Sequence, residues 1–141
     1  MAMPPIAPDL LNTFALWPDA AQSRAFDIRT LCWRVAEAAD IGALSESLKW
    51  GQPAWRPLRS RTGSTLRLSW DANAPQRLDL FVDCKTDLAA RAIDRFPAIF
   101  DSDGRRRLTL PTDDPLPQDA LWFLAEQTLT YHRTKAARAS A

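Results

Sequence analysis

The side chains best suited to binding chemistry gather in one short segment near the middle of this chain. Within ten residues it holds a carboxylate, an ammonium group, an amide and two indoles, at Glu46, Lys49, Gln52, Trp50 and Trp55. A cation and an amide beside aromatic faces can hold a carboxylate, a phosphate or a planar ring. The alternative is that both tryptophans belong to the core and that Lys49 pairs with Glu46 at the surface.

Arginines outside this segment extend the predicted site. Arg67 stands on a following strand, and Arg105–Arg107 marks a later hairpin. Guanidinium groups make forked contacts with phosphate and carboxylate oxygens. We therefore add Arg67 to the predicted ligand-binding residues. The alternative is that these arginines are solvated charges that protect strand edges from pairing with other sheets.

One catalytic pair also follows from residue types. Cys84 could act as a nucleophile with His132 as its base. The pattern places Cys84 on the apolar side of a strand and His132 on the inner face of the last helix, where both would be structural. One histidine and two separated cysteines also lack the spacing of a metal site. We therefore predict that the protein is not an enzyme and has no catalytic residues.

Composition limits the function further. The 141 residues carry 18 basic and 17 acidic side chains, and the net charge of +1 argues against an extended non-specific nucleic-acid binder. The N-terminus lacks the basic start and apolar run of a signal peptide, and no apolar run reaches the length of a membrane span. With Cys32 and Cys84 as reduced thiols, we expect a cytoplasmic protein.

Apolar spacing and turn residues predict a mixed order of helices and strands. A short helix from Asp9 to Leu16 precedes a longer one from Pro18 to about Asp40. The first strand, 48–56, is expected to be bent by Gly51 and Pro53. The remaining strands are predicted at 65–70, 78–84, 99–100 and 106–110, and the remaining helices at 87–96 and 118–133.

The long helix predicted from Pro18 to about Asp40 is expected to be amphipathic. Its apolar residues recur at helical spacing on one face, at Ile28, Leu31, Cys32, Val35 and Ala39. The opposite side carries Arg24, Arg34 and Glu37, which are expected to face solvent. This pattern predicts a helix that packs on a sheet with one face.

The element order predicts an α+β fold, an α-β3-α-β2-α sandwich with a mainly antiparallel five-stranded sheet and helices mainly on one face. We expect an N-terminal arm at 1–17 with room for a short helix, one domain at 18–133 and a frayed tail at 134–141.

Several segments resemble the bacterial YdhG-like family. The first is Glu46–Trp55, with the sequence ESLKWGQPAW. Further matching stretches occur in the family's order, at 63–68, 82–88, 114–117 and 129–132. The similarity spans residues 20–133, and it implies the YdhG-like fold for nearly the whole folded part.

The resemblance also implies an alternative function. Some members of the family look similar to frataxin in topology, and that branch is associated with intracellular iron delivery from an acidic ridge. Asp27, Glu37 and Asp40 would then bind iron as the cofactor. Arginines stand between these carboxylates, whereas hard metals favour converging oxygens without cations between them. The first prediction is therefore that no cofactor is bound.

The main functional prediction is a non-enzymatic module that binds a small anionic ligand or a partner protein near Lys49–Trp55. Six tryptophans in a small chain favour an exposed aromatic patch, so a homodimer is also expected. No nucleic-acid or membrane partner is expected.

Overall fold

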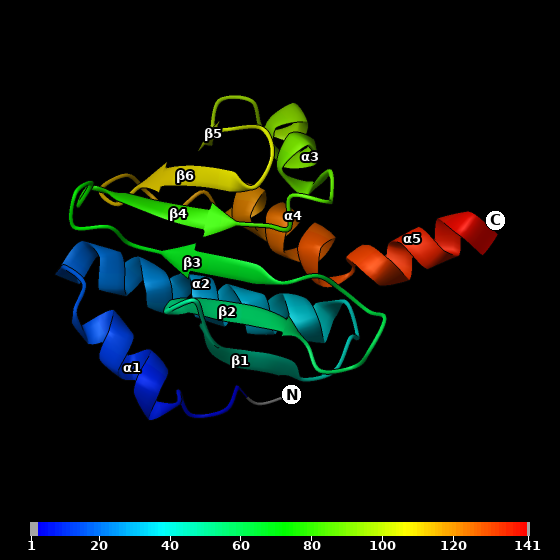
Figure 1. Cartoon of the computed structure of the whole chain (residues 1–141), viewed down its shortest axis with the longest axis horizontal. Helices are drawn as coiled ribbons and strands as arrows, with labels where there is room; N and C mark the ends of the chain where they lie inside the picture. Colours follow the sequence, from blue (N-terminus) through cyan, green and yellow to red (C-terminus); the bar gives the residue numbers. More distant parts are fainter. Residues whose placement is uncertain (1–2, 141) are drawn as a thin grey trace.

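Alternating apolar residues in this chain build a six-stranded antiparallel sheet, and helices cover one of its faces (Figure 1). The structure is a computed structural model that describes residues 3–140. The described helices are α1 (Pro8–Ala15), α2 (Asp19–Ala38), α3 (Leu88–Arg95), α4 (Gln118–Leu129) and α5 (Tyr131–Ser140). The described strands are β1 (Leu44–Lys49), β2 (Gln52–Pro57), β3 (Leu66–Ser69), β4 (Arg77–Phe81), β5 (Asp101–Ser102) and β6 (Arg107–Pro111).

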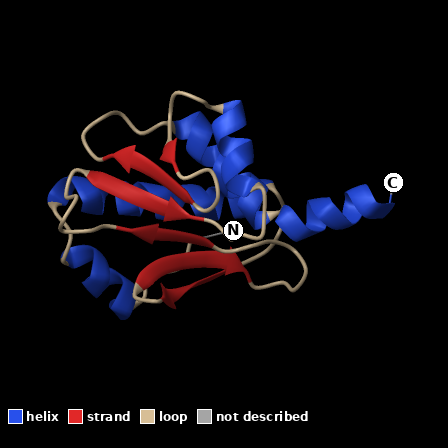
Figure 2. Ribbon diagram, turned by 45° about the horizontal axis from the view of Figure 1, so that its top comes forward, coloured by secondary structure: helices blue, strands red, loops and turns tan. Residues whose placement is uncertain are grey.

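The sheet has the order β1-β2-β3-β4-β6-β5, with every neighbouring pair antiparallel. Leucines at alternate positions of the central strands point to one face and are fully buried, at Leu66, Leu68, Leu78, Leu80, Leu108 and Leu110. Helices α2 and α4 pack on each other and lie on this inner face, and the opposite, outer face has no helix across it (Figure 2). The predicted α+β class with an antiparallel sheet is confirmed.

The strand count differs from the predicted five because the first predicted strand is a hairpin. Residues 48–56 contain the end of β1, a two-residue turn and most of β2. Trp50 and Gly51 have φ of 56° and 74°, and positive φ at both central residues allows the chain to reverse between twisted strands. The expectation of one bent strand was therefore wrong. Gly51 marks a reversal of the chain.

The polar side of α2 also differs from its prediction. Arg24, which was expected to face solvent, is buried, and so is Arg29, whereas Arg34 and Glu37 are exposed as expected. Arg24 donates a hydrogen bond from Nε to the Thr112 carbonyl oxygen at 3.0 Å. Simple amphipathicity failed here because the chain beyond β6 and the N-terminal arm cover part of the helix that periodicity assigned to solvent.

The last predicted helix divides in two at Thr130, whose φ of −112° and ψ of 8° leave helical geometry. The loop before β3 packs on this break. The Ser64 amide donates to the Thr128 carbonyl at 2.8 Å, and the Arg133 amide donates to the Thr62 carbonyl at 2.9 Å. Helix α5 then extends away from the sheet, so residues 134–140, predicted to fray, are helical (Figure 1).

The predicted N-terminal arm contains α1, which packs against α2 and β1. Leu10 and Phe14 bury its apolar side, and the Phe14 ring contacts Trp17 at a centroid distance of 5.3 Å. Within residues 3–140, none of the helices has the length and apolar character needed to cross a bilayer.

Candidate functional site

The segment predicted as the site is divided between the two faces of the sheet. In the β1–β2 hairpin Glu46 stands opposite Trp55, and Lys49 stands opposite Gln52. Successive residues of a strand point to opposite faces. The Glu46–Trp55 pair lies on the inner face toward α2, and Lys49 lies on the outer face next to the turn.

On the inner face, Glu46 is the centre of a buried polar cluster. Its carboxylate accepts hydrogen bonds from Arg29 Nε at 2.5 Å and Arg29 Nη2 at 3.0 Å. The Trp55 and Trp33 indoles donate to Glu46 Oε1 at 2.9 and 3.2 Å. Arg29 Nη2 also donates to the Pro4 carbonyl at 2.7 Å, which ties the N-terminal arm to the cluster.

This arrangement explains the electrostatics of the inner face. Burial alone would raise the pKa of Glu46, but hydrogen bonds from Arg29, Trp55 and Trp33 and the positive charge of Arg29 hold it below its ordinary value. Burial, with a smaller effect of the Glu46 charge, raises the pKa of the nearby Cys32 thiol to about 12. Cys32 therefore stays a protonated, inert thiol.

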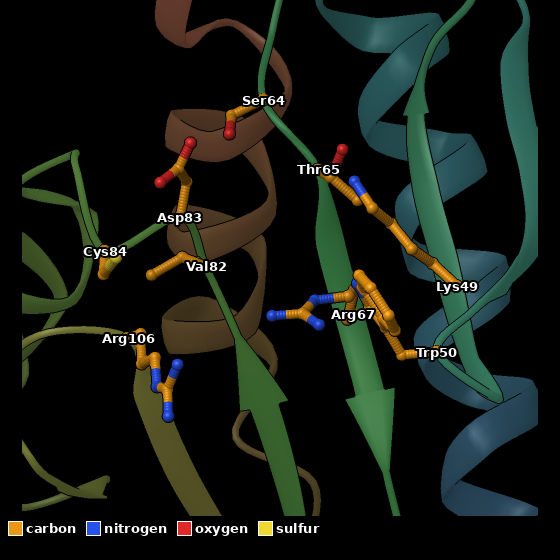
Figure 3. Close-up of a pocket in the computed structure, with 9 residues that line it drawn as sticks. All are labelled: Lys49, Trp50, Ser64, Thr65, Arg67, Val82, Asp83, Cys84 and Arg106. Atoms are coloured by element: carbon orange, nitrogen blue, oxygen red, sulfur yellow. The ribbon is translucent and has the colours of Figure 1, made fainter.

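The outer face carries an open cavity of about 200 Å³ between the β1–β2 turn, the loop before β3, the end of β4 and the start of β6 (Figure 3). We call it the cation pocket. Its lining residues are Lys49, Trp50, Ser64, Thr65, Arg67, Val82, Asp83, Cys84 and Arg106.

Local structure explains how each side of the cation pocket is positioned. The hairpin turn presents Lys49 and Trp50, and Figure 3 shows Lys49 pointing toward Thr65. The loop before β3, which carries Ser64 and Thr65, lies directly against the end of α4 at Gly63. A Cβ at this position would lie 2.0 Å from the Leu129 carbonyl oxygen. Only glycine allows this loop to approach the end of α4 so closely.

The remaining walls depend on short turns. Asp83 Oδ1 accepts a hydrogen bond from the Lys85 amide at 2.9 Å, which fixes the chain just after β4. Asp103 Oδ1 accepts hydrogen bonds from three successive amides, those of Arg105, Arg106 and Arg107. These bonds hold the pKa of Asp103 far below its ordinary value and fix the backbone that carries Arg106.

Positive charge dominates the side chains of the cation pocket. Three cations, Lys49, Arg67 and Arg106, line it together with a single carboxylate, that of Asp83. The Arg67 guanidinium also lies over the Phe81 ring, 5.5 Å from its centroid, which orients the planar group on the sheet surface. Two guanidinium groups, an ammonium group and the hydroxyls of Ser64 and Thr65 are donors suited to an oxyanion.

Three of the six residues predicted to bind ligand thus meet in one cavity: Lys49, Trp50 and Arg67. Glu46 and Trp55 belong to the buried cluster instead. The alternative was right to place Trp55 in the core, but its pairing of Lys49 with Glu46 was wrong, because Glu46 pairs with Arg29. Gln52 is half-buried outside the cation pocket, and its Oε1 is a buried atom with no hydrogen-bond partner.

Sequence reasoning did not include Ser64, Thr65 or Asp83 among the binding residues, and it considered Arg106 only as part of the run 105–107. A signal was nevertheless present. Eight of the nine lining residues fall within the segments 46–55, 63–68 and 82–88, the first three stretches that carry the resemblance to the YdhG-like family. Their convergence around one cavity could have been suspected, but it requires the sheet order to be known.

The expectation that Cys84 and His132 are both buried was wrong. Cys84 is exposed beyond the end of β4, and His132 is exposed in the first turn of α5. Cys84 lines the cation pocket, whereas His132 does not and instead contacts Tyr131 at a ring-centroid distance of 5.2 Å. The expected burial failed for Cys84 because β4 ends at Phe81, and strand alternation does not continue into the turn.

The acidic residues considered for iron, Asp27, Glu37 and Asp40, are all exposed on or just after α2. Among residues 3–140, no group of three histidine, cysteine or carboxylate side chains is placed to hold a metal ion. The predicted aromatic patch is not formed by the tryptophans, and the exposed large aromatic side chains among the described residues are Trp50 and Phe26. Of the six tryptophans only Trp50 is exposed, so the homodimer stays a prediction.

Comparison with known proteins supports the fold. A crystal structure of a DUF1801 family protein (YdhG) from Bacillus subtilis matches with a TM-score of 0.59 over 84% of this chain and 86% of that chain. The chain has a YdhG-like fold. Sequence identity over the match is 14%, and no family model and no curated protein matches the chain. The resemblance read from 46–55 is thus confirmed at the level of the YdhG-like fold.

Proposed function

We propose that this YdhG-like domain is a non-enzymatic binding module that holds a small anionic ligand in the cation pocket. One observation carries the proposal. Lys49, Arg67 and Arg106 come from three separate parts of the chain and line one cavity, where only Asp83 opposes their charge. Cations repel one another, so their convergence is favourable when an anion occupies the space between them.

Two features of the cation pocket favour binding over catalysis. The arginines are always charged and serve as fixed donors, and the hydroxyls of Ser64 and Thr65 add neutral ones. The nucleophile candidate Cys84 has no histidine beside it within this lining, because His132 lies on α5. A fixed set of donors is sufficient to recognise phosphate or carboxylate groups.

Calorimetric titration with inorganic phosphate tests the proposal. We expect phosphate to bind the unaltered chain, and to bind it more weakly at high salt. The double variant Arg67→Gln/Arg106→Gln should no longer bind phosphate. Arg77→Gln/Arg95→Gln is the matched control, because it removes the same charge from arginines outside the cation pocket. Absence of phosphate binding, or equal loss in the control, would contradict the proposal.

A further inference from the structure

Trp50 is far more exposed than is usual for a large apolar side chain. It retains 85% of its accessible surface, whereas Trp55, five residues later, retains none. An indole is a large apolar group, and leaving it in water forgoes the gain that burial gives. Folding alone therefore gives no reason for a tryptophan at this position.

The backbone of Trp50 adds a second unfavourable feature. Its φ of 56° lies in the left-handed region, at the first position of the turn. Asparagine, aspartate and glycine are the usual residues at such positions, because a bulky side chain there is strained. Strained, exposed residues of this kind are typical of functional sites.

The place of Trp50 suggests what it serves. It lines the cation pocket together with Lys49 and Arg67, and Figure 3 shows it on the hairpin side of the cavity. A ligand whose anionic group lies among Lys49, Arg67 and Arg106 would bring its next atoms against the indole. Tryptophan offers that neighbour a flat face, and flat rings stack on it.

Resting on the function proposed above, we infer that the ligand is a phosphate ester with a planar heteroaromatic ring, such as a nucleoside monophosphate. Its phosphate contacts Arg67 and Arg106, and its ring stacks on Trp50. The cavity of about 200 Å³ is smaller than those that enclose whole drug-sized ligands, so it holds the phosphate end while the ring lies on the rim. Asp83 repels a second phosphate and favours the monophosphate.

Calorimetry with adenosine monophosphate and ribose 5-phosphate separates the ring from the phosphate. We expect the unaltered chain to bind adenosine monophosphate about fivefold or more tightly than ribose 5-phosphate, the effect of one stacked base. Trp50→Asn removes the ring while suiting the left-handed turn, so it should bind both ligands equally. Trp50→Phe should keep the preference. Leu58→Asn is the control, because Leu58 is another exposed apolar residue and lies outside the cation pocket.

The outcomes distinguish this inference from the function on which it rests. If both phosphates bind the unaltered chain equally, or if Trp50→Asn keeps the preference, the stacking role is overturned and the anion site stands. If neither phosphate binds, the proposed anion site fails, and the ring specificity fails with it. A preference that Trp50→Asn abolishes and Leu58→Asn retains supports the inference.

Discussion

The two ends of one hairpin use the same residue types in opposite ways. At the inner face, Trp55 is fully buried and its indole donates to Glu46, which is paired with Arg29. At the turn, Trp50 is exposed in a left-handed conformation beside Lys49, and both line the cation pocket. In the first arrangement, the charged and polar groups of Glu46, Arg29 and Trp55 are hydrogen-bonded to one another within the fold. The second leaves cationic and aromatic groups directed outward.

The difference shows that strand register decides which residues stabilise the fold and which remain available for binding. Glu46 and Lys49 are three residues apart, so they point to opposite faces of β1. A cluster of unusual residues in the sequence can therefore contain two separate structures. Here the inner cluster fixes the hairpin on α2, and the turn end of the hairpin contributes Lys49 and Trp50 to the proposed site.

The largest loss of stability is expected from a variant that breaks the inner cluster. Glu46→Gln removes the charge that compensates Arg29, whose side chain is only 6% exposed. We expect the free energy of unfolding to fall by about 3–5 kcal/mol, because the guanidinium stays buried without a counter-charge. Lys49→Gln, on the outer face, should change it by less than about 0.5 kcal/mol. Urea unfolding measures both, and equal effects would contradict the division between the two faces.

A second variant asks whether the outer region also depends on close packing. Gly63→Ala places a Cβ against the Leu129 carbonyl, so the loop must move away from α4. We expect a loss of about 2–3 kcal/mol in urea unfolding. Gly51→Ala is the matched control, since it has positive φ but open space around it, and should cost about 1 kcal/mol. A loss at Gly63 no larger than the loss at Gly51 would contradict the close contact between this loop and the Leu129 carbonyl.

The pH dependence of stability sharpens the account of the inner cluster. The pKa of Glu46 is lower in the folded chain than in the unfolded chain, so the unfolded chain binds more protons as the pH falls. The stabilisation is present above the ordinary glutamate pKa, about 4.3, and is lost as the pH falls through the lowered pKa. Unfolding free energy should drop more steeply in acid for the unaltered chain than for Glu46→Gln. Parallel curves would contradict it.

A last variant, at the turn, should change stability in the opposite direction. Trp50→Asn should raise the free energy of unfolding by about 1 kcal/mol, because asparagine accepts the left-handed φ of 56° and no buried contact is lost. The shift of the urea midpoint measures it. Destabilisation by this variant would mean that Trp50 serves the fold, as Trp55 does.

Much of the fold could be predicted from the sequence, because most of its signals are local. The long helix, three strand positions and the antiparallel α+β class followed from apolar spacing and turn residues, whereas the strand predicted at 99–100 lies at 101–102 instead. The hairpin was missed because Gly51 and Pro53 suit a bend as well as a reversal. The break at Thr130 was missed because it depends on the distant loop at Gly63.

Less of the candidate site could be predicted, for a physical reason. Residue type identified Lys49, Trp50 and Arg67, but Glu46 and Trp55 have the same chemical character and lie on the other face. The remaining pocket residues come from loops that only the order β2-β3-β4-β6 brings together. Spatial convergence of this kind is a property of the sheet topology and has no local signal.

The most direct test of the account is an NMR titration of the ¹⁵N-labelled chain with inorganic phosphate. We predict that amide shifts will concentrate in the turn at Trp50–Gly51, the loop at 63–65, the junction at 82–84 and Arg106. The inner cluster around Arg29 and Glu46 should remain unchanged. Shifts confined to other parts of the chain, or none at millimolar phosphate, would contradict the claim that the outer face of the hairpin is a binding site.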